Sequence, residues 1–210
     1  MIAIVDYGVG NLYSLRSSFE YIGAAVTVTG DPEVLAESAR IVLPGVGAFK
    51  DAAEKLRATG LDEAVRREAL GGKPLLGICL GMQMLFDVSL EFGEHRGLGL
   101  IPGRVAPIEP LLPPGLKVPH IGWNALVFPE DKPKSRLFRY VQAGEHVYFV
   151  PSYHAADCEE AVTARAEYGA MLTAAVERGN IFGTQFHPEK SGQTGLNILR
   201  AFCEMEGGRP

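Results

Sequence analysis

The sequence has few cysteines and no obvious metal-binding pattern. Its 210 residues include only three cysteines, an odd number that cannot all pair within one chain, and none stands in a CxxC spacing. This usage fits a reducing compartment, and we expect a cytoplasmic protein. His154 and Cys158 are four residues apart, as two ligands on a helix would be, but no second pair accompanies them, so we predict no metal site.

Long apolar stretches and clusters of basic residues are also missing. No hydrophobic run approaches the roughly 20 residues of a bilayer-spanning helix, and residues 1–6 lack the basic segment and apolar core of a signal peptide. The formal net charge is -5, whereas nucleic-acid binding generally needs clustered lysine and arginine. We therefore expect neither a membrane nor a nucleic acid as partner.

The first half alternates short apolar strands with amphipathic helices, the βαβ pattern that builds a parallel sheet. With 47% hydrophobic and 21% charged residues, the chain can bury a large core, and we predict one domain spanning residues 1–210. We expect strands near 2–5, 25–29, 41–43 and 75–78, and helices over 12–22, after 31–32, over 49–58 and over 61–70.

The second half has the features of hairpins. Residues 102–119 are rich in proline, which excludes regular helix, and we expect an irregular segment there. The predicted fold class is α/β: an open, mostly parallel central sheet flanked by helices, with additional antiparallel strands in the second half. We expect strands near 121–128, 146–153, 162–166, 172–177 and 181–186, a tight turn at 178–180 and a final helix over 195–205.

A glycine-flanked cysteine follows the apolar strand 75–78. Gly77 and Gly81 enclose Cys79 in the small-x-nucleophile-x-small pattern of a strand-to-helix elbow, which presents one side chain at the edge of a parallel sheet. Residues 82–86 suit a helix that starts at this elbow, and the positive end of its dipole favours a thiolate. Without this context, Cys79 would be interpreted as a buried structural cysteine.

A histidine and a carboxylate stand two residues apart near the end of the sequence. If this stretch is extended, His187 and Glu189 project from the same face of one strand, and Glu189 can hold the imidazole in the tautomer that serves Cys79. The short pattern alone is weak, because Pro188 could simply end a strand. Its combination with the elbow predicts a Cys-His-Glu hydrolase.

Acyl transfer also needs N–H donors for the oxyanion that develops on the attacked carbonyl. The N–H of Leu80, directly after the nucleophile, is one candidate. The turn 45–47, which contains Val46 and Gly47, is another, because it ends strand 41–43 and open α/β sheets place their ligands at the carboxyl ends of strands.

Residues 8–13 partly resemble a dinucleotide-binding loop. Gly8 and Gly10 follow the first strand, and Asp31 lies about where a ribose-binding acid would. Tyr13, however, stands where a third glycine would let the helix approach the strand. We interpret the glycines as a turn before a helix with Asn11 at its N-cap, and we predict no cofactor.

These motifs together resemble the class I (triad) glutamine amidotransferases, and within that family the branch formed by the glutaminase subunits of imidazole glycerol phosphate synthases. One position departs from the family pattern: Pro151 stands where a histidine usually precedes Ser152, and proline removes a main-chain donor. The similar segments run from the first strand to the final helix: Asp6-Tyr7-Gly8-Val9-Gly10-Asn11-Leu12, Leu43-Pro44-Gly45-Val46-Gly47-Ala48-Phe49, Gly77-Ile78-Cys79-Leu80-Gly81-Met82-Gln83, Gly97-Leu98-Gly99-Leu100-Ile101-Pro102-Gly103, His120-Ile121-Gly122-Trp123-Asn124 and His187-Pro188-Glu189-Lys190-Ser191-Gly192.

The resemblance implies that Cys79, His187 and Glu189 hydrolyse L-glutamine to glutamate and ammonia, with a peptide of the turn 45–47 in the oxyanion hole. Gln83 lies one helical turn after Cys79, although it could be an exposed helix glutamine. Glu91, close to Gly93, could likewise be a solvated loop charge. The residues that the resemblance implies for substrate binding are Gly47, Gln83, Glu91, Ser152 and Tyr153.

The resemblance also implies a partner. In this branch, ammonia passes through a sheltered channel to a (β/α)8-barrel cyclase subunit, which makes imidazole glycerol phosphate for histidine biosynthesis and releases an aminoimidazole carboxamide ribotide. Trp123, the only tryptophan, suits the centre of such an interface or equally a core anchor. Four residues match segments near the cyclase contact or the ammonia route: Asn11, His120, Trp123 and Lys190.

Two other functions stay open at this point. The triad alone does not name the acceptor of the ammonia, so the chain could serve a different synthase, and a catalytically dead amidotransferase fold could act only in binding. We also predict that the isolated chain is a poor glutaminase. Val46 is β-branched and resists positive φ, so a donor-forward peptide in the turn 45–47 is unfavourable until a partner biases it.

Overall fold

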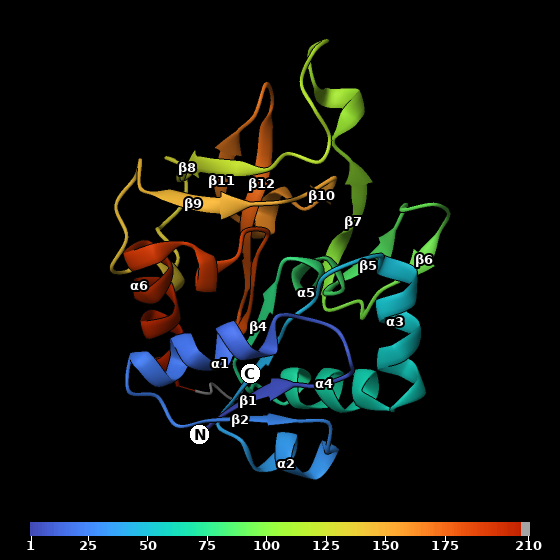
Figure 1. Cartoon of the computed structure of the whole chain (residues 1–210), viewed down its shortest axis with the longest axis vertical. Helices are drawn as coiled ribbons and strands as arrows, with labels where there is room; N and C mark the ends of the chain where they lie inside the picture. Colours follow the sequence, from blue (N-terminus) through green and yellow to red (C-terminus); the bar gives the residue numbers. More distant parts are fainter. Residues whose placement is uncertain (207–210) are drawn as a thin grey trace.

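The computed structural model describes residues 1–206 and is built around a seven-stranded sheet (Figure 1). The strand order is β11-β12-β13-β4-β3-β1-β2. The five strands from β13 to β2 are parallel, and β12 and β11 extend the sheet in antiparallel pairing. The strands are β1 (Ile2–Val5), β2 (Val26–Thr29), β3 (Arg40–Leu43), β4 (Leu75–Ile78), β11 (Val162–Glu167), β12 (Met171–Arg178) and β13 (Ile181–Thr184).

Helices cover both faces of this sheet, which confirms the predicted α/β class (Figure 1). The apolar sides of α1 and α6 pack on one face through residues such as Phe19 and Phe202. The apolar sides of α2, α3 and α4 pack on the other face through residues such as Leu35, Leu56 and Val65. Their bounds are α1 (Leu12–Tyr21), α2 (Pro32–Glu37), α3 (Phe49–Ala58), α4 (Leu61–Leu70) and α6 (Gly192–Cys203).

The expected turn between the last two strands is present. Arg178 pairs with Ile181 across the antiparallel β12–β13 ladder, so Gly179 and Asn180 form a two-residue connection. Gly179 has φ 62°, a left-handed conformation that glycine adopts without strain. None of the helices in residues 1–206 is both long enough and apolar enough to cross a bilayer.

Two smaller sheets complete the fold, and one of them corrects the prediction of an irregular segment over 102–119. Residues 101–107 form β7, in which Pro102 and Gly103 lie at a register shift between paired Ile101 and Arg104. A proline is tolerated there because a bulge leaves its position unpaired. The sheets are β10-β7-β5-β6, with β5 (Phe86–Ser89), β6 (His95–Arg96), β7 (Ile101–Pro107) and β10 (Tyr153–Ala156), and β8-β9, with β8 (Gly122–Ala125) and β9 (His146–Phe149).

Three further expectations about local structure were wrong. The helix after the elbow, α5 (Leu80–Gln83), has only four residues, and Phe86 begins β5 instead of continuing it. The strand expected over 146–153 is interrupted at 150–152, where Pro151 separates β9 from β10. The last strand ends at Thr184, so residues 187–189 do not belong to it.

Glycines allow the elbow to pack closely against the sheet. A Cβ on Gly81 would lie 1.9 Å from the carbonyl oxygen of Leu43 in β3, and one on Gly77 would lie 2.7 Å from the carbonyl oxygen of Gly81. Both contacts are with backbone atoms, which cannot move aside as a side chain can. The glycines that sequence reasoning assigned to a sharp turn are therefore needed for close approach as well.

We predict that Gly81→Ala lowers the free energy of unfolding by about 3 kcal/mol, because the added methyl group overpacks a contact between two backbone segments. Urea denaturation would measure the change. The matched control is Gly71→Ala, where φ is -75° and the nearest atoms to the new Cβ are 3.4 Å away, so a change of no more than about 0.5 kcal/mol is expected. Equal stabilities for the two variants would contradict the packing argument.

Candidate active site

The predicted nucleophile stands at a strained backbone position between β4 and α5. Cys79 has φ 55° and ψ -111°, a conformation that costs about 1–3 kcal/mol in a residue other than glycine. Its N–H donates to the carbonyl oxygen of Thr184 at 2.7 Å, which ties the elbow to the neighbouring strand β13. The thiol is half-buried.

The predicted base and its carboxylate are in contact, although not in the way that sequence reasoning expected. His187 lies three residues beyond β13, and Glu189 belongs to a 3-10 turn, η4 (Pro188–Lys190). Pro188 starts this turn, which folds the carboxylate back toward the ring. The Nδ1 atom of His187 is 2.9 Å from Oε1 of Glu189, and both side chains are buried.

Two hydrogen bonds hold the main chain of His187 in place. The N–H of His187 donates to the carbonyl oxygen of Tyr148 at 3.0 Å, and the hydroxyl of Ser191 donates to the carbonyl oxygen of His187 at 2.6 Å. The Ser191 hydroxyl also accepts the N–H of Tyr148 at 3.0 Å. The ring is thus positioned by β9 and by the start of α6.

The surroundings of His187 favour an imidazolium ion. Burial lowers the pKa of its ring, but hydrogen bonds to Cys79 and Glu189 raise it, and the result is a pKa of about 10. With Nδ1 on the carboxylate, Nε2 is the atom that can exchange a proton with the sulfur. Because α5 is so short, its dipole is weaker than that of a full helix, and the neighbouring cation is the main partner of a thiolate.

A small cavity connects these groups with the residues predicted to bind substrate. Its volume is about 170 Å³, below the roughly 300 Å³ at which sites for larger ligands begin, so it suits a molecule of amino-acid size. Gln83 is only 6% exposed, which excludes the exposed helix glutamine. The lining residues are Val46, Gly47, Cys79, Leu80, Gln83, Glu91, Val150, Pro151, Ser152, Tyr153, Gln185 and His187.

The residues expected to supply N–H donors for an oxyanion line the same cavity. Leu80 is the first residue of α5, so its N–H has no acceptor within the helix. In the turn 45–47, Gly47 has φ 92° whereas Val46 does not have positive φ, in line with the resistance of a β-branched residue to that conformation. The Oε2 atom of Glu91 accepts the N–H of Phe49 at 2.7 Å, which leaves Oε1 for a ligand.

The four residues assigned to a partner or an ammonia route do not line this cavity. Asn11 occupies the N-cap of α1, which confirms the predicted position, although its side chain makes no capping bond. The ring of His120 stacks on Tyr168 at 3.7 Å between centroids. Trp123 packs edge-on against Tyr148, and Lys190 Nζ lies 5.9 Å from the centre of that same ring.

Sequence reasoning missed two residues beside the nucleophile. The hydroxyl of Tyr7 is buried and donates to the carbonyl oxygen of Pro44 at 2.7 Å, directly before the turn 45–47. The side chain of Gln185 reaches both Gln83 and Cys79. Only its place two residues before His187 could have indicated it, because a glutamine at the end of a strand is chemically inconspicuous.

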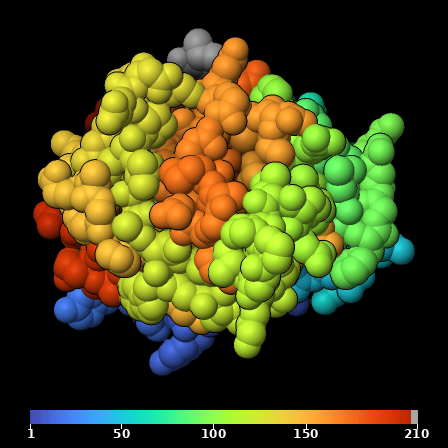
Figure 2. Space-filling model, turned by 90° about the horizontal axis from the view of Figure 1, so that it is seen from above, coloured from blue at the N-terminus to red at the C-terminus, as the bar shows by residue number. Residues whose placement is uncertain are grey.

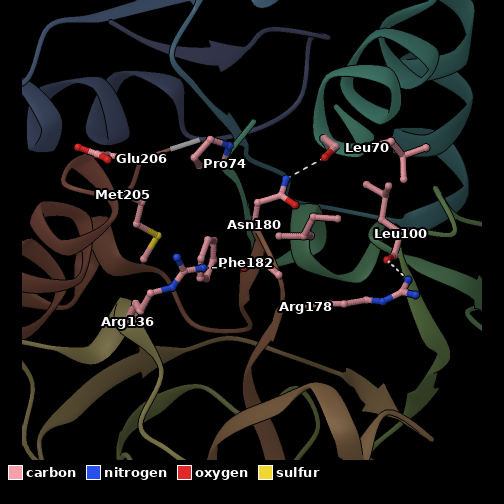
Figure 3. Close-up of a pocket in the computed structure, with 12 residues that line it drawn as sticks. Leu70, Pro74, Leu100, Arg136, Arg178, Asn180, Phe182, Met205 and Glu206 are labelled. Carbon is pink, nitrogen blue, oxygen red and sulfur yellow. Dashed lines mark hydrogen bonds between the residues drawn. The ribbon is translucent and has the colours of Figure 1, made fainter. Parts of the chain in front are cut away.

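A second cavity, of about 450 Å³, lies at the opposite ends of β4 and β13 (Figure 3). Two of its polar side chains are already engaged: Asn180 donates to the carbonyl oxygens of Ala69 and Lys73, and Arg178 donates to that of Leu100. Its lining residues, all within the described part of the chain, include neither cysteine nor histidine. Ligand chemistry therefore belongs at the carboxyl ends of these parallel strands, where Cys79 lies.

The family model of the class-I glutamine amidotransferases matches residues 3–205. The chain belongs to this family. Two curated relatives, each called imidazole glycerol phosphate synthase subunit HisH, come from Syntrophotalea carbinolica and Methanothermobacter thermautotrophicus. The first is 47% identical, over 98% of this chain and 100% of the relative, and the second is 51% identical, over 98% of both. The resemblance predicted from the motifs is thus confirmed.

Solved structures give the same fold at low sequence identity. A crystal structure titled glutamine amidotransferase aligns with a TM-score of 0.74 at 19% identity, covering 97% of this chain and 98% of that one. PurLQS from Thermotoga maritima aligns with a TM-score of 0.70 at 19% identity, covering 96% of each chain. The α/β scaffold of the amidotransferase is therefore shared with structures whose sequences differ widely.

The charge on His187 leads to a prediction about alkaline stability. The folded-state pKa of about 10 lies above the ordinary value of 6.5, so the folded amidotransferase binds this proton more tightly than the unfolded chain. The stabilising contribution is complete below pH 6.5 and is lost as the pH rises toward and through 10. The difference in unfolding free energy between the wild type and His187→Asn should therefore shrink across this range.

Urea denaturation at pH 6, 8 and 10 would measure that difference. The control is His146→Asn at an exposed position of β9, for which we expect no such trend. A His187→Asn difference that stayed constant or grew with pH would contradict an imidazolium at this site.

Proposed function

We propose that the chain acts as one amidotransferase domain that hydrolyses L-glutamine to glutamate and ammonia and delivers the ammonia to a (β/α)8-barrel cyclase subunit. It would thereby be the glutaminase subunit of an imidazole glycerol phosphate synthase, in histidine biosynthesis. The observation that carries the catalytic part is the buried imidazole, 2.9 Å from a buried carboxylate and beside a half-buried thiol in a cavity of amino-acid size.

The arrangement supports a two-step acyl transfer. The Cys79 thiolate attacks the carboxamide carbon of glutamine, and the oxyanion that develops accepts N–H bonds from Leu80 and from the turn 45–47. The His187 imidazolium gives its Nε2 proton to the departing nitrogen, which leaves as ammonia, and a thioester stays on the sulfur. Water, deprotonated by the neutral imidazole, then attacks the thioester, releasing glutamate and restoring the thiolate with its imidazolium.

The polar groups of the cavity match the rest of the substrate. Glu91 has one carboxylate oxygen that makes no bond to Phe49, and it suits an α-ammonium group. Ser152 lies between β9 and β10, Tyr153 is the first residue of β10, and both line the same cavity. Pro151 also lines the cavity, and its carbonyl oxygen accepts the N–H of His120 at 2.9 Å, so this departure from the family pattern adjoins both the substrate and the proposed partner.

The exposed surface supports a partner on the side of the thiol. Trp123 is 53% exposed and Ile121 is 60% exposed, although both are large apolar residues. Figure 2 looks down on the molecule from above, where the segment between β7 and β8 lies beside the hairpin β11–β12. Trp123 packs edge-on against Tyr148, Lys190 Nζ lies over the same ring, and the carbonyl oxygen of Tyr148 accepts the N–H of His187. A partner bound here would adjoin the catalytic histidine.

The direct test of this function is glutamate release by the full chain, with and without the barrel subunit and its nucleotide substrate. We expect Cys79→Ala to lower the rate by about 10³-fold or more, since it removes the nucleophile, while Cys203→Ala at a half-buried position should retain activity. We expect little release without the partner. Equal rates for Cys79→Ala and the wild type would reject the nucleophile, and coupling only to a different synthase would reject the pathway.

The only tryptophan offers a test of the proposed interface. We expect Trp123→Ala to weaken binding to the barrel subunit by about tenfold or more, since exposed aromatic residues at interface centres carry much of the binding energy. Titration calorimetry would measure the change. Tyr21→Ala, which truncates an aromatic ring 80% exposed at the far end of α1, is the control. Equal affinities for the two variants would place the partner elsewhere.

A further inference from the structure

Gln185 is a buried polar residue that the reaction described above does not use. It is 1% exposed and directly follows β13, and its main-chain N–H donates to the carbonyl oxygen of Ala174 at 2.8 Å. A glutamine that is fully buried loses its hydration, so its carboxamide needs partners within the protein. Its partners here are two residues of the candidate active site.

The carboxamide of Gln185 lies between the nucleophile and Gln83. Its Oε1 accepts from Nε2 of Gln83 at 3.1 Å, and its own Nε2 is 3.8 Å from the sulfur of Cys79, a donor distance for sulfur. The bond to Gln83 fixes which end of the Gln185 amide faces the sulfur. The same Nε2 of Gln83 also donates to the carbonyl oxygen of Tyr153 at 3.3 Å.

This network gives Gln83 a defined orientation. Its two N–H groups are both engaged, by Gln185 and by Tyr153, so the group that Gln83 still offers to the cavity is its oxygen. An oxygen acceptor fits an N–H of an amide or an ammonium group. It disfavours a second carboxylate, which is what the side chain of glutamine becomes after hydrolysis.

We propose that Gln185 is a positioning residue with two roles: it donates to the Cys79 sulfur and thereby favours the thiolate, and it holds the oxygen of Gln83 toward the ligand so that the site prefers glutamine over glutamate. The second role rests on the proposed glutaminase function, whereas the first does not. The chemistry of the contact supports the first role, since a hydrogen bond to a charged acceptor is about twice as strong as one to a neutral acceptor. Because the Gln185 amide carries no charge, it does not take up the proton of His187.

The pH profile of Cys79 alkylation by iodoacetamide tests the first role without any glutamine. In the full chain, peptide mass spectrometry separates Cys79 from Cys158 and Cys203. We expect Gln185→Glu, which cannot donate to the sulfur and adds a negative charge, to move the alkylation midpoint up by about one pH unit, equivalent to about tenfold slower labelling at pH values below the wild-type midpoint. Gln185→Leu should move it in the same direction by less.

Glutaminase kinetics in the complex with the barrel subunit test the second role. Gln185→Glu still accepts from Gln83, so KM should stay within about twofold of the wild type while kcat falls. Gln185→Leu frees the Gln83 amide, so KM should rise about tenfold or more and inhibition by glutamate should strengthen relative to glutamine binding. The matched controls are Gln142→Glu and Gln142→Leu at an exposed position, which should change neither measurement.

The outcomes separate the two proposals. A role in folding alone would lower the thermal midpoint of both Gln185 variants but leave the alkylation profile and the ratio of KM to kcat unchanged, and that result would overturn the inference. An unshifted alkylation midpoint in folded Gln185→Glu would overturn the role at the sulfur. A shifted midpoint in a chain whose wild type released no glutamate would instead uphold that role, and it would overturn both the proposed function and the second role.

Discussion

The site depends on one backbone position, the elbow at Cys79. Positive φ at a residue with a side chain is unfavourable, and it persists here because α5 is pressed against the sheet by contacts that only glycine permits at positions 77 and 81. In that conformation Cys79 lines a cavity together with residues that follow β3 and β13. The packing of the elbow against the sheet thus fixes the position of Cys79, around which the other residues of the site are arranged.

The second constraint is the charge around the Cys79 sulfur, because a thiolate in a half-buried position needs a nearby cation. The buried pair of His187 and Glu189 brings a cation to the sulfur, and burial alone would have removed the proton from that imidazole. Buried ion pairs contribute little net stability when they replace apolar packing. Their presence here is better explained by the proposed chemistry, in which a ring that is protonated before the reaction can donate its proton to the departing ammonia.

Much of the site could be read from the sequence because its signals are local. The glycines around Cys79 and the spacing of His187 and Glu189 are short patterns with a direct stereochemical meaning. Other features could not be predicted from local patterns. Gln185 is recognisable only once β13 lies beside β4. The path of residues 187–189 could not be predicted either, because Pro188 starts a 3-10 turn there instead of ending a strand. The strand at 101–107 was missed for a similar reason, since a bulge that tolerates proline needs a partner strand to define it.

The order of the strands has a consequence for how the protein matures. The proposed nucleophile, Cys79, follows β4, whereas its proposed acid, His187, lies more than 100 residues later, just beyond β13, and the two strands are immediate neighbours in the sheet. During synthesis the thiol therefore emerges long before the imidazole proposed to activate it, and pairing such distant segments is a late, slow event in folding. A chain that stops before residue 187 has the thiol without the imidazole, so the proposed reactivity arises only after β13 has paired with β4.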